Sequence, residues 1–165
     1  MSMALGLTLL AMAVPVGGEL RPISIQYHGD NGSLPPPYRR STSISVDVEG
    51  RGSLIRRHGY DLSDPAQAFE ADFVLSVDQR QAFARRVDEL GAWKLRWKAQ
   101  SRPPVGGPLV HLRLTSGERV IEVPAFPVAS QQALAAELRA AVIALVPESV
   151  GAARERWEQG KGDAE

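Results

Sequence analysis

Short segments in which apolar and polar residues alternate recur along this chain, and they restrict it to a fold built on an antiparallel sheet. The alternation is clear in residues 23–28, 43–48, 110–115 and 119–123. Because successive side chains of a strand point to opposite faces, each segment is predicted to be a strand with one buried and one exposed face. Glycine-containing turns join 43–48 to 53–58 and 110–115 to 119–123, which predicts two β-hairpins.

Two further segments have the spacing of amphipathic helices. The first begins at Ser76, which has capping-box spacing with Gln79, and ends before Gly91. The second is the alanine-rich stretch 130–145, and a further strand is expected at 69–75. The prediction is an α+β fold, with a mainly antiparallel sheet of about six or seven strands and two helices packed on one face. Twice in the chain a hairpin is followed by a short apolar segment that leads into a helix, at 73–76 and at 126–130, which suggests two ββα-like units.

Length and composition limit the domain organisation and several kinds of chemistry. The 165 residues accommodate one domain with a substantial core, placed at 19–147, and 148–165 are expected to add a helical turn and a flexible tail. The 19 basic and 19 acidic residues cancel, so attraction to a polyanion requires a local patch. The absence of cysteine excludes disulfides, thiolate nucleophiles and Cys-ligated zinc.

Residues 1–18 contain the one segment that resembles a targeting signal. An apolar run over 3–13 closes on an Ala-x-Ala site, as in a secretory signal, but no Lys or Arg precedes it. Export to the periplasm or the outside, an apolar first strand, and an over-long start of a cytoplasmic protein all remain open interpretations. The run is shorter than the roughly 20 residues that a membrane-spanning helix needs, so we expect no integral membrane segment in the mature chain.

Strict alternation also marks the stretch Trp93–Lys98, Trp-Lys-Leu-Arg-Trp-Lys. It predicts a strand directly after the first helix, with the tryptophans on the core side. On the other side Lys94, Arg96 and Lys98 would stand about 7 Å apart, a spacing that suits successive phosphates. A basic face that is charged for solubility is the simpler interpretation.

The loop between the first two strands contains Pro35-Pro36-Pro37-Tyr38, the four-residue pattern that WW domains recognise in their ligands. Tyr38, Arg39 and Arg40 are therefore candidate contacts for a partner protein. The alternative is that the prolines only fix the connection, with Tyr38 packed over the edge of the sheet.

The histidines supply the one candidate for acid–base or metal chemistry. His28 and His58 are predicted to end strands beside glycine loops, so they could converge, together with Asp30 and Asp61, if those strands pair. Neither belongs to a short-spaced ligand motif, and a third nitrogen would have to come from distant His111. No Gly-x-Ser-x-Gly elbow or phosphate-binding loop is present, so we predict no catalytic residue and no cofactor.

These observations favour a non-catalytic binding or interaction module, which contacts another protein through the Pro-rich loop and the basic residues Lys94, Arg96 and Lys98. Two alternatives remain. One is a metal-assisted hydrolase that uses His28, His58 and Asp61, and the other is a weak binder of nucleic acid or another polyanion.

Overall fold

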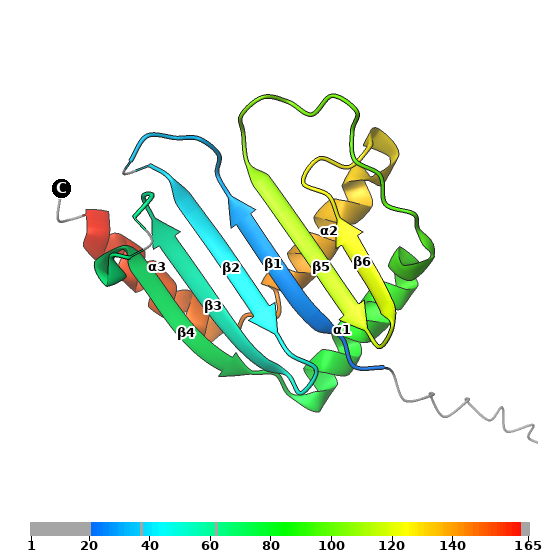
Figure 1. Cartoon of the computed structure of the whole chain (residues 1–165). Helices are drawn as coiled ribbons and strands as arrows, with labels where there is room; N and C mark the ends of the chain where they lie inside the picture. Colours follow the sequence, from blue (N-terminus) through cyan, green and yellow to red (C-terminus); the bar gives the residue numbers. More distant parts are fainter. Residues whose placement is uncertain (1–20, 37, 62, 163–165) are drawn as a thin grey trace, which may run out of the picture.

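The structure, a computed structural model, describes residues 21–36, 38–61 and 63–162 and confirms the α+β class. Six antiparallel strands form one sheet in the order β4-β3-β2-β1-β5-β6 (Figure 1). The predictions for residues 1–18 lie outside the described residues. The strands are β1 (Ser24–Asp30), β2 (Arg40–Val46), β3 (Arg51–His58), β4 (Ala68–Val74), β5 (Leu109–Ser116) and β6 (Arg119–Val123).

Three α-helices cover one face of this sheet (Figure 1). Helix α1 packs against α2, α2 contacts β1, and α3 contacts the edge strand β4. Short 3-10 helices precede β4, follow α1 and precede α2. The helices are α1 (Val77–Glu89), α2 (Gln132–Ile143) and α3 (Glu148–Gly162), and the 3-10 helices are Pro65–Gln67, Ala92–Lys94 and Ala129–Gln131.

Strand alternation separates the sheet into two faces of different chemistry. The side that packs on the helices, called here the helix face, carries the apolar residues of the core. The other side, the open face, carries polar side chains. The helix face contributes Ile25, Ile44, Leu54, Leu112, Leu114 and Ile121 to the core.

Each edge of the sheet ends in a hairpin that leads into a helix, β3-β4 into α1 and β5-β6 into α2. The two segments therefore share a ββα order. In the second, the hairpin is the predicted one, whereas the predicted first hairpin is β2-β3, and β4 separates it from α1. At the start of α1, the Ser76 hydroxyl accepts from the Gln79 backbone N–H at 3.1 Å, and the Gln79 side chain accepts from Ser76 at 2.9 Å. This reciprocal pair is the predicted capping box.

The strand predicted at Trp93–Lys98 is wrong. Gly91 takes a left-handed backbone with φ of 64°, and Ala92–Lys94 then forms a 3-10 turn in which Ala92 is fully buried. Further on, the Arg96 carbonyl and the Lys98 N–H both bond to the side chain of Gln131. The Lys98 carbonyl accepts from Val128 N–H, and neither residue belongs to one of the six strands. Alternation alone does not distinguish such a segment from a strand, because it does not reveal whether a pairing partner exists.

The C-terminal segment also differs from the single helical turn that the sequence predicts, because α3 extends over Glu148–Gly162. Its contacts with the sheet explain the difference. The Trp157 ring lies 4.8 Å from that of His58 and 6.1 Å from that of Phe69, and Glu158 accepts from Arg56 at 2.8 Å. These tertiary contacts stabilise a helix whose own amphipathic pattern is weak.

Candidate functional site

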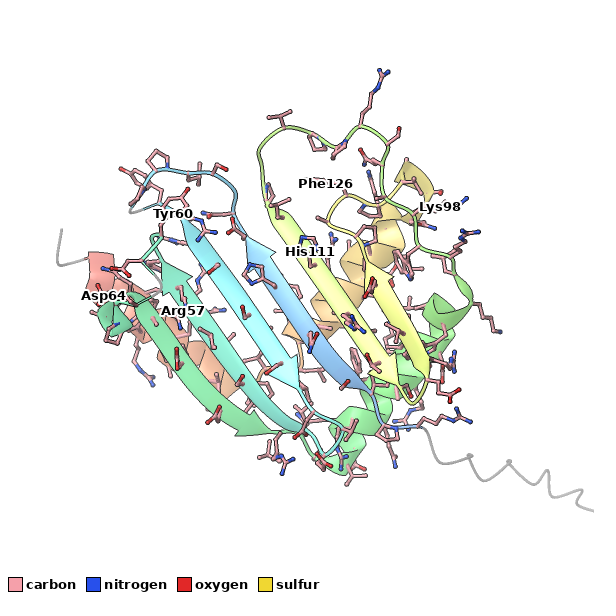
Figure 2. The ribbon with its side chains drawn as sticks, in the orientation of Figure 1. Arg57, Tyr60, Asp64, Lys98, His111 and Phe126 are labelled. Atoms are coloured by element: carbon pink, nitrogen blue, oxygen red, sulfur yellow. The ribbon has the colours of Figure 1, made fainter. Side chains whose placement is uncertain are left out.

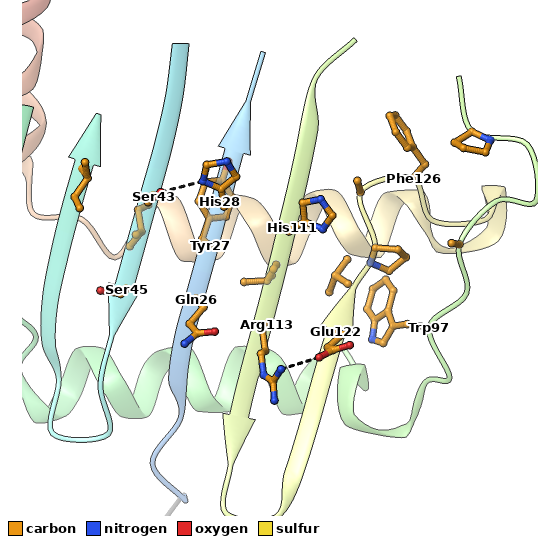
Figure 3. A pocket seen from close by; sticks show the side chains of 18 of the residues that line it. Gln26, Tyr27, His28, Ser43, Ser45, Trp97, His111, Arg113, Glu122 and Phe126 are labelled. Carbon is orange, nitrogen blue, oxygen red and sulfur yellow. Dashed lines mark hydrogen bonds and ion pairs between the residues drawn. The ribbon is translucent and has the colours of Figure 1, made fainter. Parts of the chain in front are cut away.

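The open face carries a set of polar side chains that we call the polar floor. Strand pairing aligns them in two rows that cross the sheet, with Gln26 opposite Arg113 in one row and His28 opposite His111 in the other. Figure 3 shows these side chains on the same side of the strands. The polar floor consists of Gln26, His28, Ser43, Ser45, Ser53, His111, Arg113 and Glu122.

Hydrogen bonds between neighbouring strands fix part of the polar floor. His28 Nδ1 lies 3.0 Å from the Ser43 hydroxyl, and the Ser45 and Ser53 hydroxyl oxygens are 2.9 Å apart. Arg113 donates to Glu122 at 2.9 Å. A serine hydroxyl has one donor and two acceptor positions, so each bonded serine keeps capacity for a ligand.

Two floor residues have their full hydrogen-bonding capacity available. Within the described ranges, the Gln26 amide and the His111 imidazole have no side-chain hydrogen bond. Both point away from the helix face, and His111 lies in the middle of the viewed face in Figure 2. The floor therefore presents donors and acceptors that only water or a ligand can satisfy.

Beside β6, two segments outside the sheet supply the apolar side of the site, which we call the wall and which consists of Trp97, Pro103, Pro124 and Phe126. Figure 3 shows Trp97 and Phe126 on this side of the strands. The segments pair with each other. The Gln100 backbone N–H donates to the Phe126 carbonyl at 2.9 Å, and the Val128 backbone N–H donates to the Lys98 carbonyl at 3.0 Å. The wall is thus a small, internally bonded unit.

Gln131 attaches the first wall segment to the body of the protein. Its side-chain amide donates to the Arg96 carbonyl at 2.9 Å and accepts from Lys98 N–H at 2.9 Å. Gln131 is buried, at 7% exposure, and it immediately precedes α2. This bidentate contact holds the backbone on both sides of Trp97, whose side chain packs against the core.

Arg139 of α2 attaches the second wall segment. Its guanidinium Nη2 donates to the carbonyls of Val110, Pro124 and Ala125 at 2.9, 2.8 and 3.2 Å. Burial lowers the pKa of the Arg139 side chain, and the nearby Tyr27 opposes that shift. One partly buried cation therefore joins the start of β5 to the segment that carries Phe126.

Floor and wall together enclose a cavity of about 960 Å³. That volume lies at the upper end of the range of sites that bind drug-sized molecules, roughly 300–1,000 Å³. Among the described residues that line it, Arg113 and Glu122 are the only Arg, Lys, Asp or Glu side chains, and they pair with each other. The cavity combines a hydrogen-bonding base, in which the one ion pair is balanced, with an apolar side.

The histidines and Asp61 do not come together. His28 lies on the open face, whereas His58 is buried on the helix face against Trp157. Asp61 is exposed in the loop after β3, where the Ser63 N–H and hydroxyl donate to it and lower its pKa. In the part of the chain that the structure describes, no three His, Asp or Glu side chains are grouped to hold a metal ion.

The residues of the Pro-rich loop have different environments. Tyr38 is 65% exposed. Arg39 is ion-paired with Asp30, and its guanidinium lies 4.5 Å from the centre of the Tyr60 ring. Arg40 begins β2 and is exposed. Pro37 lies outside the described residues, and binding of a partner protein through this loop stays a prediction.

The basic residues Lys94, Arg96 and Lys98 are exposed but do not form the regular row expected of a strand. Lys94 belongs to the 3-10 turn, and the other two flank Trp97. In Figure 2, Lys98 lies on the segment beyond β6, away from the polar floor. The spacing of about 7 Å between neighbouring basic side chains, which is expected from a strand and would match successive phosphates, therefore does not apply to these three residues.

Sequence reasoning did not recognise the polar floor and the wall as one site. The alternation of 23–28, 43–48, 110–115 and 119–123 did place most floor residues opposite the core residues. It gave no indication that β1 pairs with both β2 and β5, which brings His111 beside His28. The position of Trp97 depends on Gln131, a residue 34 positions further along the chain, so no local pattern reports it.

Replacement of Gln131 by methionine is expected to lower the free energy of unfolding by about 2 kcal/mol, because two backbone groups lose their partner. The indole N–H resonance of Trp97 in an NMR spectrum should shift and broaden. The neighbouring Gln132 is exposed, so Gln132→Met is the matched control and should change neither quantity. Equal behaviour of the two variants would contradict this role for Gln131.

None of the helices in the described ranges combines the length and the apolar composition needed to cross a membrane. No protein-family model and no curated protein sequence matches this chain. The functional evidence in this protein therefore comes from the side chains that line the cavity.

Proposed function

We propose that this protein is a non-catalytic binding module, and that its ligand occupies the cavity between the polar floor and the wall. The observation that carries the proposal is the presence of Gln26 and His111, with unused hydrogen-bonding capacity, in the base of a cavity of about 960 Å³. Convergent polar groups in a large concave site are typical of ligand-binding pockets.

The Ser43–His28 pair is the one arrangement in the cavity that resembles an activated nucleophile, and two features argue against that role. The backbone of β2 is paired on both sides, with β1 and β3, so the N–H groups around Ser43 are not available to form an oxyanion hole. The one carboxylate that lines the cavity, Glu122, is ion-paired with Arg113. Binding is the better interpretation of this pair.

Fragment binding tests the proposal without knowledge of the natural ligand. A library of small soluble fragments is titrated into isotope-labelled protein, and the shifted amide signals are mapped onto the structure. We expect the hits to cluster on the strands and segments around Gln26, His111 and Phe126. A library with no hits, or hits that cluster elsewhere, would contradict the proposal.

A variant that fills the cavity provides the matched control. Ser45 is an exposed floor residue of β2, and an aromatic side chain is well tolerated at an exposed position of a strand. Ser45→Phe is therefore expected to fold normally and to abolish fragment binding. Thr115→Phe places the same ring on the open face outside the cavity lining and should leave binding unchanged.

A further inference from the structure

We propose that the ligand of this cavity is a neutral saccharide, whose hydroxyl groups bond to the polar floor while one face of a sugar ring packs on Trp97. This inference rests on the proposed function and names its ligand class. It follows from three properties of the cavity: the kind of hydrogen-bonding groups, the lack of net charge, and the aromatic side.

The hydrogen-bonding groups of the floor match those of a sugar. A sugar hydroxyl both donates and accepts, and the hydroxyls of Ser43, Ser45 and Ser53 do the same. The Gln26 amide offers two donors and a carbonyl acceptor, and the two ring nitrogens of the His111 imidazole add further hydrogen-bonding positions. Because each hydroxyl group of a ligand can either donate or accept, a ligand rich in hydroxyl groups can form hydrogen bonds with both the donors and the acceptors of the floor.

The lack of net charge separates a saccharide from anionic ligands. Sites for phosphate or carboxylate groups usually present an arginine as a bidentate donor. Here Arg113 donates to Glu122 at 2.9 Å, and no other residue with a fixed positive charge lines the cavity among the described residues. A nucleotide or sugar phosphate would have to compete with that ion pair.

The wall supplies the apolar surface that a sugar ring needs. The faces of aromatic rings are electron-rich and attract C–H groups of partial positive charge. Trp97 and Phe126 both line the cavity (Figure 3), and Trp97 is held there by packing on the hydrophobic core. An entirely apolar ligand such as a fatty acid is disfavoured. It would cover Gln26 and the serines without giving them hydrogen-bond partners, and that burial is unfavourable.

Binding of a set of probes tests the inference. The protein is titrated by NMR and calorimetry with glucose, N-acetylglucosamine and short neutral oligosaccharides, and in parallel with a sugar phosphate, adenosine and decanoate. We expect at least one neutral saccharide to bind, and to shift the signals of His111 and Trp97. The sugar phosphate should bind more weakly than its neutral parent, and decanoate should not compete.

Variants locate the binding. Trp97→Ala is expected to weaken saccharide binding about tenfold or more, and Trp97→Phe should restore most of the affinity because it keeps an aromatic face. Ser45→Phe should abolish binding, and Thr115→Phe should not affect it. Thermal unfolding of each variant shows whether it is folded. If Trp97→Ala does not fold, Trp97→Phe and Ser45→Phe still decide the question.

The outcomes separate this inference from the function on which it rests. If fragments cluster in the cavity but no neutral saccharide binds, or if adenosine or decanoate binds there in preference, the saccharide assignment is overturned and the binding module stands. Saccharide binding that Ser45→Phe leaves intact would place the site elsewhere and overturn the inference. If neither fragments nor saccharides bind in the cavity, both fail.

Discussion

Replacement of Arg39 by methionine is expected to lower the free energy of unfolding by about 3 kcal/mol, because it leaves a buried carboxylate without its counter-charge. The side chain of Asp30 is 8% exposed and that of Arg39 is 20% exposed. Asp30 also accepts from Gly32 N–H at 2.6 Å, so the carboxylate stays in place when the arginine is removed. Chemical denaturation of the two proteins measures the difference.

Two further variants show whether the buried charge is the cause. Arg40 is the next residue and is exposed, so Arg40→Met should change stability by no more than about 0.5 kcal/mol. Combining Asp30→Asn with Arg39→Met removes both charges and is expected to recover at least half of the loss. If Arg39→Met is no more destabilising than Arg40→Met, this interpretation of the ion pair is wrong.

Arg139→Met is the second change with a large expected effect, again about 3 kcal/mol. The carbonyls of Val110, Pro124 and Ala125 would lose the donor that Arg139 supplies, and part-buried carbonyls without a donor are unfavourable. The effect should extend to the wall. NMR signals of Phe126 are expected to broaden, and fragment affinity for the cavity should fall together with stability.

An arginine on the same layer of helices provides the control for Arg139. Arg86 of α1 donates to Glu137 at 2.6 Å, and the two side chains are about half exposed. Because exposed ion pairs contribute about 1 kcal/mol or less, Arg86→Met should have a small effect and leave Phe126 unchanged. Arg139→Lys keeps one cation with fewer donors, and its stability should lie between those of the parent and Arg139→Met.

Local patterns predicted the elements whose formation depends on local information. Alternation in 43–48 and 110–115 identified β2 and β5, and the Ser76–Gln79 spacing identified the start of α1. In each case the residues that decide the structure lie within one turn or one strand of each other. The same alternation failed at Trp93–Lys98, where a turn after Gly91 and the distant amide of Gln131 decide the backbone.

The candidate site could not be predicted because it is assembled by long-range pairing. His28 and His111 become neighbours only because β5 joins the free edge of β1, and β1 and β5 are separated by three strands and a helix in the chain. His58 was grouped with His28 on the assumption that strand ends converge. Its position in β3 gives it the opposite orientation, toward Trp157, since a shift of one residue along a strand changes the face.

The two-faced sheet has a consequence for how this protein can change over evolutionary time. The core residues that hold the fold together, such as Leu54 and Leu112, point to the helices, whereas most of the polar floor lies on the same strands but contributes little to the core. Substitutions at Ser43, Ser45 or Gln26 can therefore alter what the cavity accepts at small cost in folding free energy. The scaffold can acquire a new specificity without first becoming more stable.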